Sequence, residues 1–219
     1  MNARRTSSRV IGALFLGGFL FYGGGFGLVT SVIETPDFLA QMALHETALL
    51  AGAVLMLVNI ALDVGKGVLF FPIVEPYGRR TALTYLSAII VQVVLLAVGG
   101  LFLLMLVPLG QAIAGADPAT VARAQELGNV LIAGNEMAYH IGQASLSVGG
   151  AFLSALLYRT ALIPRLLAGL GVFGYAMHFV GSVAELLGIP IGLILLIPGG
   201  LFELALAFWL LLKGIDEGD

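Results

Sequence analysis

Long uncharged runs of apolar residues, each bounded by charged or turn-forming residues, dominate the chain. A helix that crosses a bilayer needs about 20 consecutive, mostly apolar residues. Six runs reach that length, and they predict an all-α, polytopic integral membrane protein: a bundle of six transmembrane helices in a single domain, residues 1–219. The predicted spans cover about residues 10–33, 47–74, 81–107, 135–158, 164–187 and 189–212.

Two stretches between the spans predict short helices at the membrane interface, at about 36–45 and 118–132. The second has a clear start signal, because Asp117 is followed by a proline in the first helical position. A single helix covering this stretch and the next span would measure about 60 Å, roughly twice the hydrocarbon thickness. We therefore expect a break at Gly134–Asn135. One long helix projecting into solvent is the alternative.

The basic residues indicate the orientation. With six spans, eight of the ten Lys and Arg residues share one side, and Arg123 is the basic residue of the other side. Cytoplasmic connections carry an excess of Lys and Arg, so we expect both termini in the cytoplasm. The eight residues are Arg4, Arg5, Arg9, Arg79, Arg80, Arg159, Arg165 and Lys213.

Composition narrows the class of protein further. Apolar residues make up 59% of the chain and charged residues 11%, against about a quarter charged in soluble domains. So few charges exclude a soluble enzyme and a disordered chain, and a net charge of −3 offers no basic patch for nucleic acid. The chain has no cysteine, which excludes disulfides and thiolate chemistry. The expected partner is the lipid bilayer.

Two segments carry a family resemblance. Residues 156–167 read LLYRTALIPRLL, similar to LLYRSRLIPRWL in the bacterial membrane family catalogued as domain of unknown function 4386. Residues 201–214 read LFELALAFWLLLKG, similar to that family's closing E-L-x-L-A-x-W-L-x-x-K-G, and Arg9–Gly12 resembles its opening. The resemblance implies six helices and a location in the bacterial cytoplasmic (inner) membrane. It implies no activity.

Ionisable residues at membrane depth are candidates for function, because a charge there costs several kcal/mol. Asp63 and Lys66 are three apart and can pair on one helix. Glu203 follows Pro198–Gly200, where we expect the last helix to break, as helices do in transporters. These features indicate transport or sensing of a small solute or proton; a static triad that fixes helix register is the alternative. The buried polar candidates are Asp63, Lys66, Glu203, Asn59 and Gln92.

A second polar group falls in the outer half of the fourth and fifth predicted spans. Glu136 and His140 share one helix face, and His178 and Glu185 share another. Imidazole with carboxylate suits Zn²⁺ or Fe²⁺, and two facing histidines suit a haem iron. A metal- or haem-binding membrane enzyme is therefore an alternative function. The simpler interpretation is that the histidines bond to neighbours such as Gln143 and line a small polar cavity.

Small residues recur at helical spacing in the first span. Gly23 and Gly27 are four apart and predict a contact face, either inside the bundle or on a second copy of the chain. This pattern supports a third hypothesis, a structural or assembly subunit of a membrane complex. The sequence identifies no catalytic constellation and no cofactor.

Overall fold

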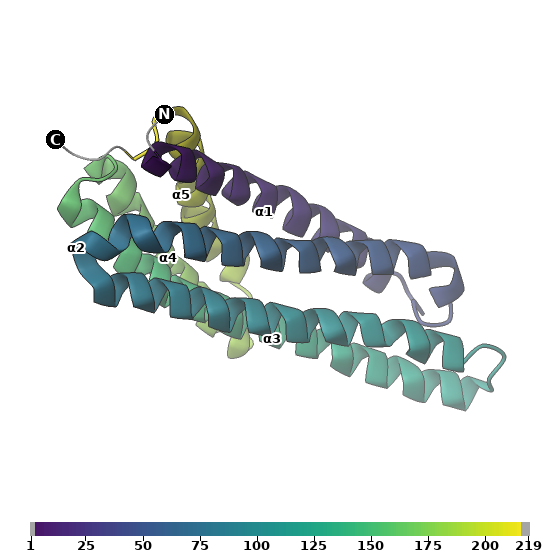
Figure 1. The fold of residues 1–219 in the computed structure, drawn as a ribbon. Helices are drawn as coiled ribbons and strands as arrows, with labels where there is room; N and C mark the ends of the chain where they lie inside the picture. Colours follow the sequence, from purple (N-terminus) through teal and green to yellow (C-terminus); the bar gives the residue numbers. More distant parts are fainter. Residues whose placement is uncertain (1–2, 216–219) are drawn as a thin grey trace.

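Five α-helices make up the fold of residues 3–215, the part that this computed structural model describes, the side chains of Ala3 and Leu193 excepted (Figure 1). All five are long and apolar enough to cross a membrane, by length and composition. No strand occurs within residues 3–215, so the all-α prediction is confirmed. The helices are α1 (Ala3–Ile33), α2 (Met42–Ala112), α3 (Pro118–Thr160), α4 (Arg165–Leu186) and α5 (Gly192–Leu212).

Helix α2 consists of two arms that meet at Gly78. This residue departs from helical geometry, with φ 179° and ψ 83°, and the chain reverses there, so that the two arms run side by side (Figure 1). The predicted spans 47–74 and 81–107 lie in these arms. The structure therefore has five helices where the pattern predicts six, because one non-helical residue replaces the expected connecting loop.

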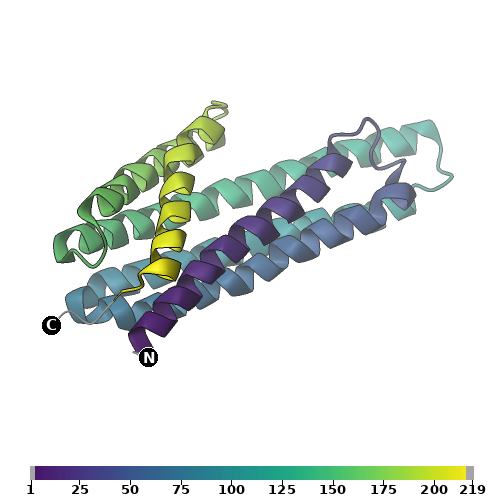
Figure 2. The same ribbon diagram turned by 90° about the horizontal axis from the view of Figure 1, so that it is seen from above.

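The helices form a closed bundle in which each packs on the next and α5 packs back on α1. The start of α1, the end of α5 and the Gly78 turn lie at one end of the molecule (Figure 1, Figure 2). The α1–α2 and α2–α3 connections lie at the other end. Helices α1, α2 and α3 extend well beyond α4 and α5 toward these connections.

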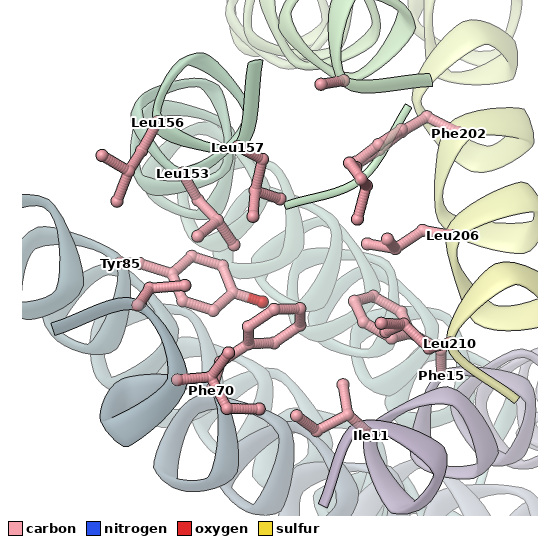
Figure 3. Packing of buried hydrophobic residues seen from close by; sticks show 14 of the residues in the cluster. Ile11, Phe15, Phe70, Tyr85, Leu153, Leu156, Leu157, Phe202, Leu206 and Leu210 are labelled. Atoms are coloured by element: carbon pink, nitrogen blue, oxygen red, sulfur yellow. The ribbon is translucent and has the colours of Figure 1, made fainter. Parts of the chain in front are cut away.

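Two apolar clusters form the core. The first draws on all five helices and includes Phe15, Phe70, Tyr85 and Phe202, which surround a common centre (Figure 3). The second lies toward the opposite end and joins α1, both arms of α2, the α1–α2 connection and the start of α3. Along the first arm of α2, the polar residues Asn59, Asp63 and Lys66 lie between Met56 of the second cluster and Phe70 of the first.

Helix α3 is continuous, so the expected break at Gly134–Asn135 and the separate surface helix 118–132 are wrong. The second arm of α2 supports α3 at this point: a Cβ on Gly134 would lie 3.0 Å from the Phe102 ring, so this glycine allows close packing. The N-cap of α3 is as expected, since the Asp117 carboxylate accepts hydrogen bonds from Ala119 N at 3.0 Å and from Thr120 N at 3.1 Å.

The short helix expected at 36–45 does not form. Residues 34–41 make a series of turns, and α2 begins at Met42. Phe38 and Leu39 are 2% and 1% exposed within the second cluster, so burial of side chains rather than a run of helical hydrogen bonds holds this connection.

Candidate functional site

The predicted pair on α2 exists and is buried. Lys66 Nζ lies 2.5 Å from Asp63 Oδ1, and the two side chains are 11% and 5% exposed. Asn59, one turn earlier, donates from Nδ2 to Asp63 Oδ2 at 3.0 Å. Both carboxylate oxygens of Asp63 are therefore engaged from its own helix, since residues three and four apart share a helix face.

Helix α1 closes over this pair. The Lys66 ammonium lies 4.5 Å from the centre of the Phe15 ring, a cation–π distance. A Cβ on Gly18 would lie 3.0 Å from Asn59 Oδ1, so the absence of a side chain there lets α1 approach. Phe15 belongs to the first apolar cluster, which places the ammonium at the edge of a hydrophobic environment.

Glu203 reaches the same region from α5. It accepts a hydrogen bond at 2.8 Å from the hydroxyl of Tyr175 on α4, a residue that is 2% exposed. The Tyr175 ring packs on Gly150 of α3, where a Cβ would lie 2.5 Å from ring atoms. Glu203 and Lys66 interact electrostatically, but no ion pair within 4 Å joins them.

This arrangement places two carboxylates near one ammonium in a poorly solvated interior. A buried charge without a close opposite charge is costly, so Glu203 is the member of the cluster that gains most from binding a proton or a cation. It is also partly exposed, whereas Asp63 is buried. The cluster of Asn59, Asp63, Lys66, Tyr175 and Glu203, called the charge cluster below, therefore holds two carboxylates, one ammonium and two further hydrogen-bonding side chains.

Gln92 stands apart from the charge cluster. It is 4% exposed on the second arm of α2, and its Oε1 has no hydrogen-bond partner among the described residues. Gly142 of α3 packs against the Gln92 backbone. The structure thus confirms its burial but does not connect it to the other inner candidates.

The expected break at Pro198–Gly200 is wrong. Helix α5 runs through Pro198 without interruption. Gly174 of α4 packs directly on this point, where its Cβ would lie 2.8 Å from Gly199 Cα. Two glycines facing each other allow close helix contact, and the contact holds the backbone in place although proline removes one hydrogen bond.

The outer polar residues divide between different roles. Glu185 accepts from Gly192 N at 2.6 Å and so closes the turn from α4 into α5, while Glu136 is exposed. His178 is 8% exposed, its Nε2 has no partner within the described residues, and it interacts electrostatically with His140. Residues 3–215 contain no group of three or more His, Asp or Glu placed to hold a metal ion, so the four metal candidates do not form a ligand set.

The hydrogen bond expected between a histidine and Gln143 is not formed. Gln143 is 8% exposed, and its backbone oxygen accepts from Ser147 Oγ at 2.7 Å. Helical Ser and Thr often bond the carbonyl four residues earlier in this way. Gln143 is therefore a buried residue of α3 whose backbone carbonyl takes part in a bond within its own helix.

Several tyrosines near the charge cluster are not among the residues predicted from sequence. Tyr22 and Tyr139 stack with ring centres 5.7 Å apart, and Tyr139 meets His140 edge-on at 5.2 Å. Tyr22 lies in the vicinity of Asp63, and Tyr139 in the vicinity of Glu203. The Tyr85 hydroxyl points into the first apolar cluster (Figure 3). No spacing in the sequence links these residues, since they come together only when α1, α2 and α3 pack.

Within residues 3–215 the fold is an all-α bundle whose five helices are long and apolar enough to cross a membrane, with ionisable side chains in its interior. The chain matches, over residues 10–214, the family described as Domain of unknown function (DUF4386), and it belongs to that family. The resemblance seen in the sequence is thereby confirmed. Comparison with curated proteins and with solved structures gave no match.

Proposed function

We propose that the chain crosses the bacterial inner membrane six times, with both termini in the cytoplasm. Each arm of α2 is about 50 Å long, enough for one crossing. The Gly78 turn carries Arg79 and Arg80 and lies at the same end as the start of α1, which carries further arginines (Figure 1). The opposite end carries Arg123 as its basic residue beside Asp37 and Asp117, so the positive-inside rule favours this orientation.

Labelling of introduced cysteines tests this topology without removal of any native thiol. Single cysteines at Tyr77 and Ala114, which are both exposed at opposite ends, are the probes. In intact cells a membrane-impermeant maleimide should modify position 114 but not position 77. Labelling of both positions from outside, or of position 77 alone, would contradict six crossings with cytoplasmic termini.

We propose further that the protein transports or senses protons, or a small cationic solute, through the charge cluster. The observation that carries this proposal is Glu203, a carboxylate held by Tyr175 and facing an ammonium already paired with Asp63. Intramembrane carboxylates of this kind belong to proton relays in pumps and transporters. The stacked Tyr22 and Tyr139 lie near this cluster, and the Tyr139 ring meets His140 edge-on.

Proton flux into liposomes containing the purified protein and a trapped pH dye tests the proposal. Glu203→Gln keeps the shape of the side chain but removes its titration, and flux should fall at least tenfold. Glu75→Gln is the matched control, because Glu75 pairs with Arg79 at an exposed site. Equal flux in the Glu203→Gln and unaltered proteins would overturn the proposal and favour the static triad.

The open glycines of α1 favour a second role, self-association. A Cβ on Gly23 or Gly27 would meet nothing within 4 Å, whereas Gly25 packs against Gly52 of α2. The outward face of α1 thus offers a close approach to another helix. Gly23→Leu with Gly27→Leu should abolish a dimer seen by crosslinking, and Gly200→Leu, also in open space, should not. A monomer in both the unaltered and variant proteins would refute this role.

A further inference from the structure

Two adjoining grooves run along the outer side of α4 at the end of the molecule that holds the Gly78 turn. The larger, of about 1020 Å³, lies between α4 and α5 and is bounded by Leu170 and Trp209. The smaller, of about 520 Å³, lies between α4 and α3 and is bounded by Ala155 and Val172. Tyr158 and Phe173 line both, so the grooves form one forked surface.

The local sequence creates this surface. Gly169 has no side chain, and a Cβ there would still lie 3.9 Å from the Tyr158 ring, so the space between α3 and α4 stays open. Phe173 is 54% exposed, although it stands between the two grooves. In the membrane orientation proposed above, lipid acyl chains are the apolar groups that meet this exposed surface.

Two arginines stand at the mouth of the grooves. Arg159 lines the smaller groove at the end of α3, and Arg165 lines the larger one as the first residue of α4. Both are exposed, and neither forms an ion pair with an acidic side chain of residues 3–215. The N-cap of α4 is Pro164, which makes no side-chain cap bond, so the positive helix end adds to the charge.

We propose that this forked surface binds one anionic glycerophospholipid, with its two acyl chains in the two grooves and its phosphate on Arg159 and Arg165. Charge complementarity selects the headgroup, because basic pockets at the cytoplasmic side of helix bundles bind anionic lipids. Tyr158 and Trp209 fit this level, since aromatic residues gather where apolar core meets headgroups. The proposal rests on the membrane orientation proposed above and is independent of proton transport.

Native mass spectrometry of the detergent-purified protein, titrated with phosphatidylglycerol and with phosphatidylcholine of the same chains, tests the site. Each basic residue near the membrane surface strengthens binding of an anionic lipid about fivefold. Removal of both arginines by Arg159→Gln with Arg165→Gln should therefore weaken phosphatidylglycerol binding about 30-fold. Arg79→Gln with Arg80→Gln removes the same charge at the same end of the molecule and is the matched control.

A second variant probes the grooves themselves. Gly169→Leu fills the space beside Tyr158 and should weaken binding of both lipids while both arginines remain. Equal affinity for the two lipids, or equal loss in the arginine variants and their control, would overturn the site. Normal lipid selectivity in a protein without proton flux would refute the proposed transport and leave the lipid site standing. Labelling of position 77 rather than position 114 from outside the cell would refute the membrane orientation.

Discussion

Substitution of Lys66 by methionine is the most direct perturbation of the charge cluster. Methionine keeps an unbranched side chain of similar length and its contact with Phe15, but removes the ammonium. The Asp63 carboxylate, 5% exposed, then loses its partner at 2.5 Å and keeps only the hydrogen bond from Asn59. We expect a well-packed protein with an uncompensated negative charge in its interior.

The magnitude follows from this burial. Removal of one partner of a buried ion pair costs about 3–5 kcal/mol, and burial this deep leaves little room for solvent screening. Replacement of both partners is often neutral. Lys66→Met with Asp63→Asn should therefore recover most of the loss. Glu203 lacks its cation in both variants, so the difference between them measures the cost of the unpaired Asp63.

Unfolding in mixed micelles with increasing sodium dodecyl sulfate measures this difference. Trp209 is the single tryptophan and lies on α5, so its fluorescence reports separation of the helices. We expect the single variant to unfold at clearly lower detergent fraction than the double variant. If the single variant is as stable as the unaltered protein, or if the double variant is the less stable of the two, the reasoning about a costly buried charge is refuted.

Three further predictions concern other contacts. Tyr175→Phe removes the donor to Glu203 and should cost about 1.5–3 kcal/mol in the same unfolding assay, the range for bonds to charged groups; an unchanged midpoint would show that the bond does not stabilise the fold. Gly25→Ala forces a methyl group into Gly52 of α2 and should cost about 1–3 kcal/mol, whereas Gly23→Ala, in open space, should change stability by less than about 0.5 kcal/mol. Asp117, which lies outside the membrane spans, has a pKa lowered by hydrogen bonds from the Thr120 hydroxyl and backbone N–H, so the Asp117 cap stabilises α3 above the unfolded pKa and is lost as pH falls through the lowered value. Protection of the first turn of α3 from hydrogen exchange should therefore fall on acidification, and Asp117→Ala should abolish this pH dependence.

Much of the charge cluster was predictable from sequence, because its members stand out against an apolar background. Asp63 and Lys66 needed only helical spacing to be paired, and that pairing is confirmed. Glu203 accepts a hydrogen bond from Tyr175, which lies 28 positions away and on another helix. No local pattern in the sequence encodes that contact.

Two of the errors concern expected helix breaks, the first inferred from the length of a single helix and the second from local preference. Gly134 and Pro198 both predicted breaks, and both lie in continuous helices. In each case a neighbouring helix packs closely on the backbone at that point, Phe102 on the first and Gly174 on the second. Packing energy over a long interface outweighs a local propensity of about 1–3 kcal/mol.

The sequence by itself determined the membrane class, the helical content and the short list of buried ionisable residues, because hydrocarbon leaves few alternatives to an apolar helix and makes every internal charge conspicuous. The tertiary structure decided which of those residues meet. It joined Glu203 to Tyr175, directed Glu185 to the backbone of α5, and within residues 3–215 gathered no metal-ligand set around the outer histidines. The physical reason is that contacts between helices depend on how their faces rotate and pack, and the periodicity of one helix carries no information about the face of another.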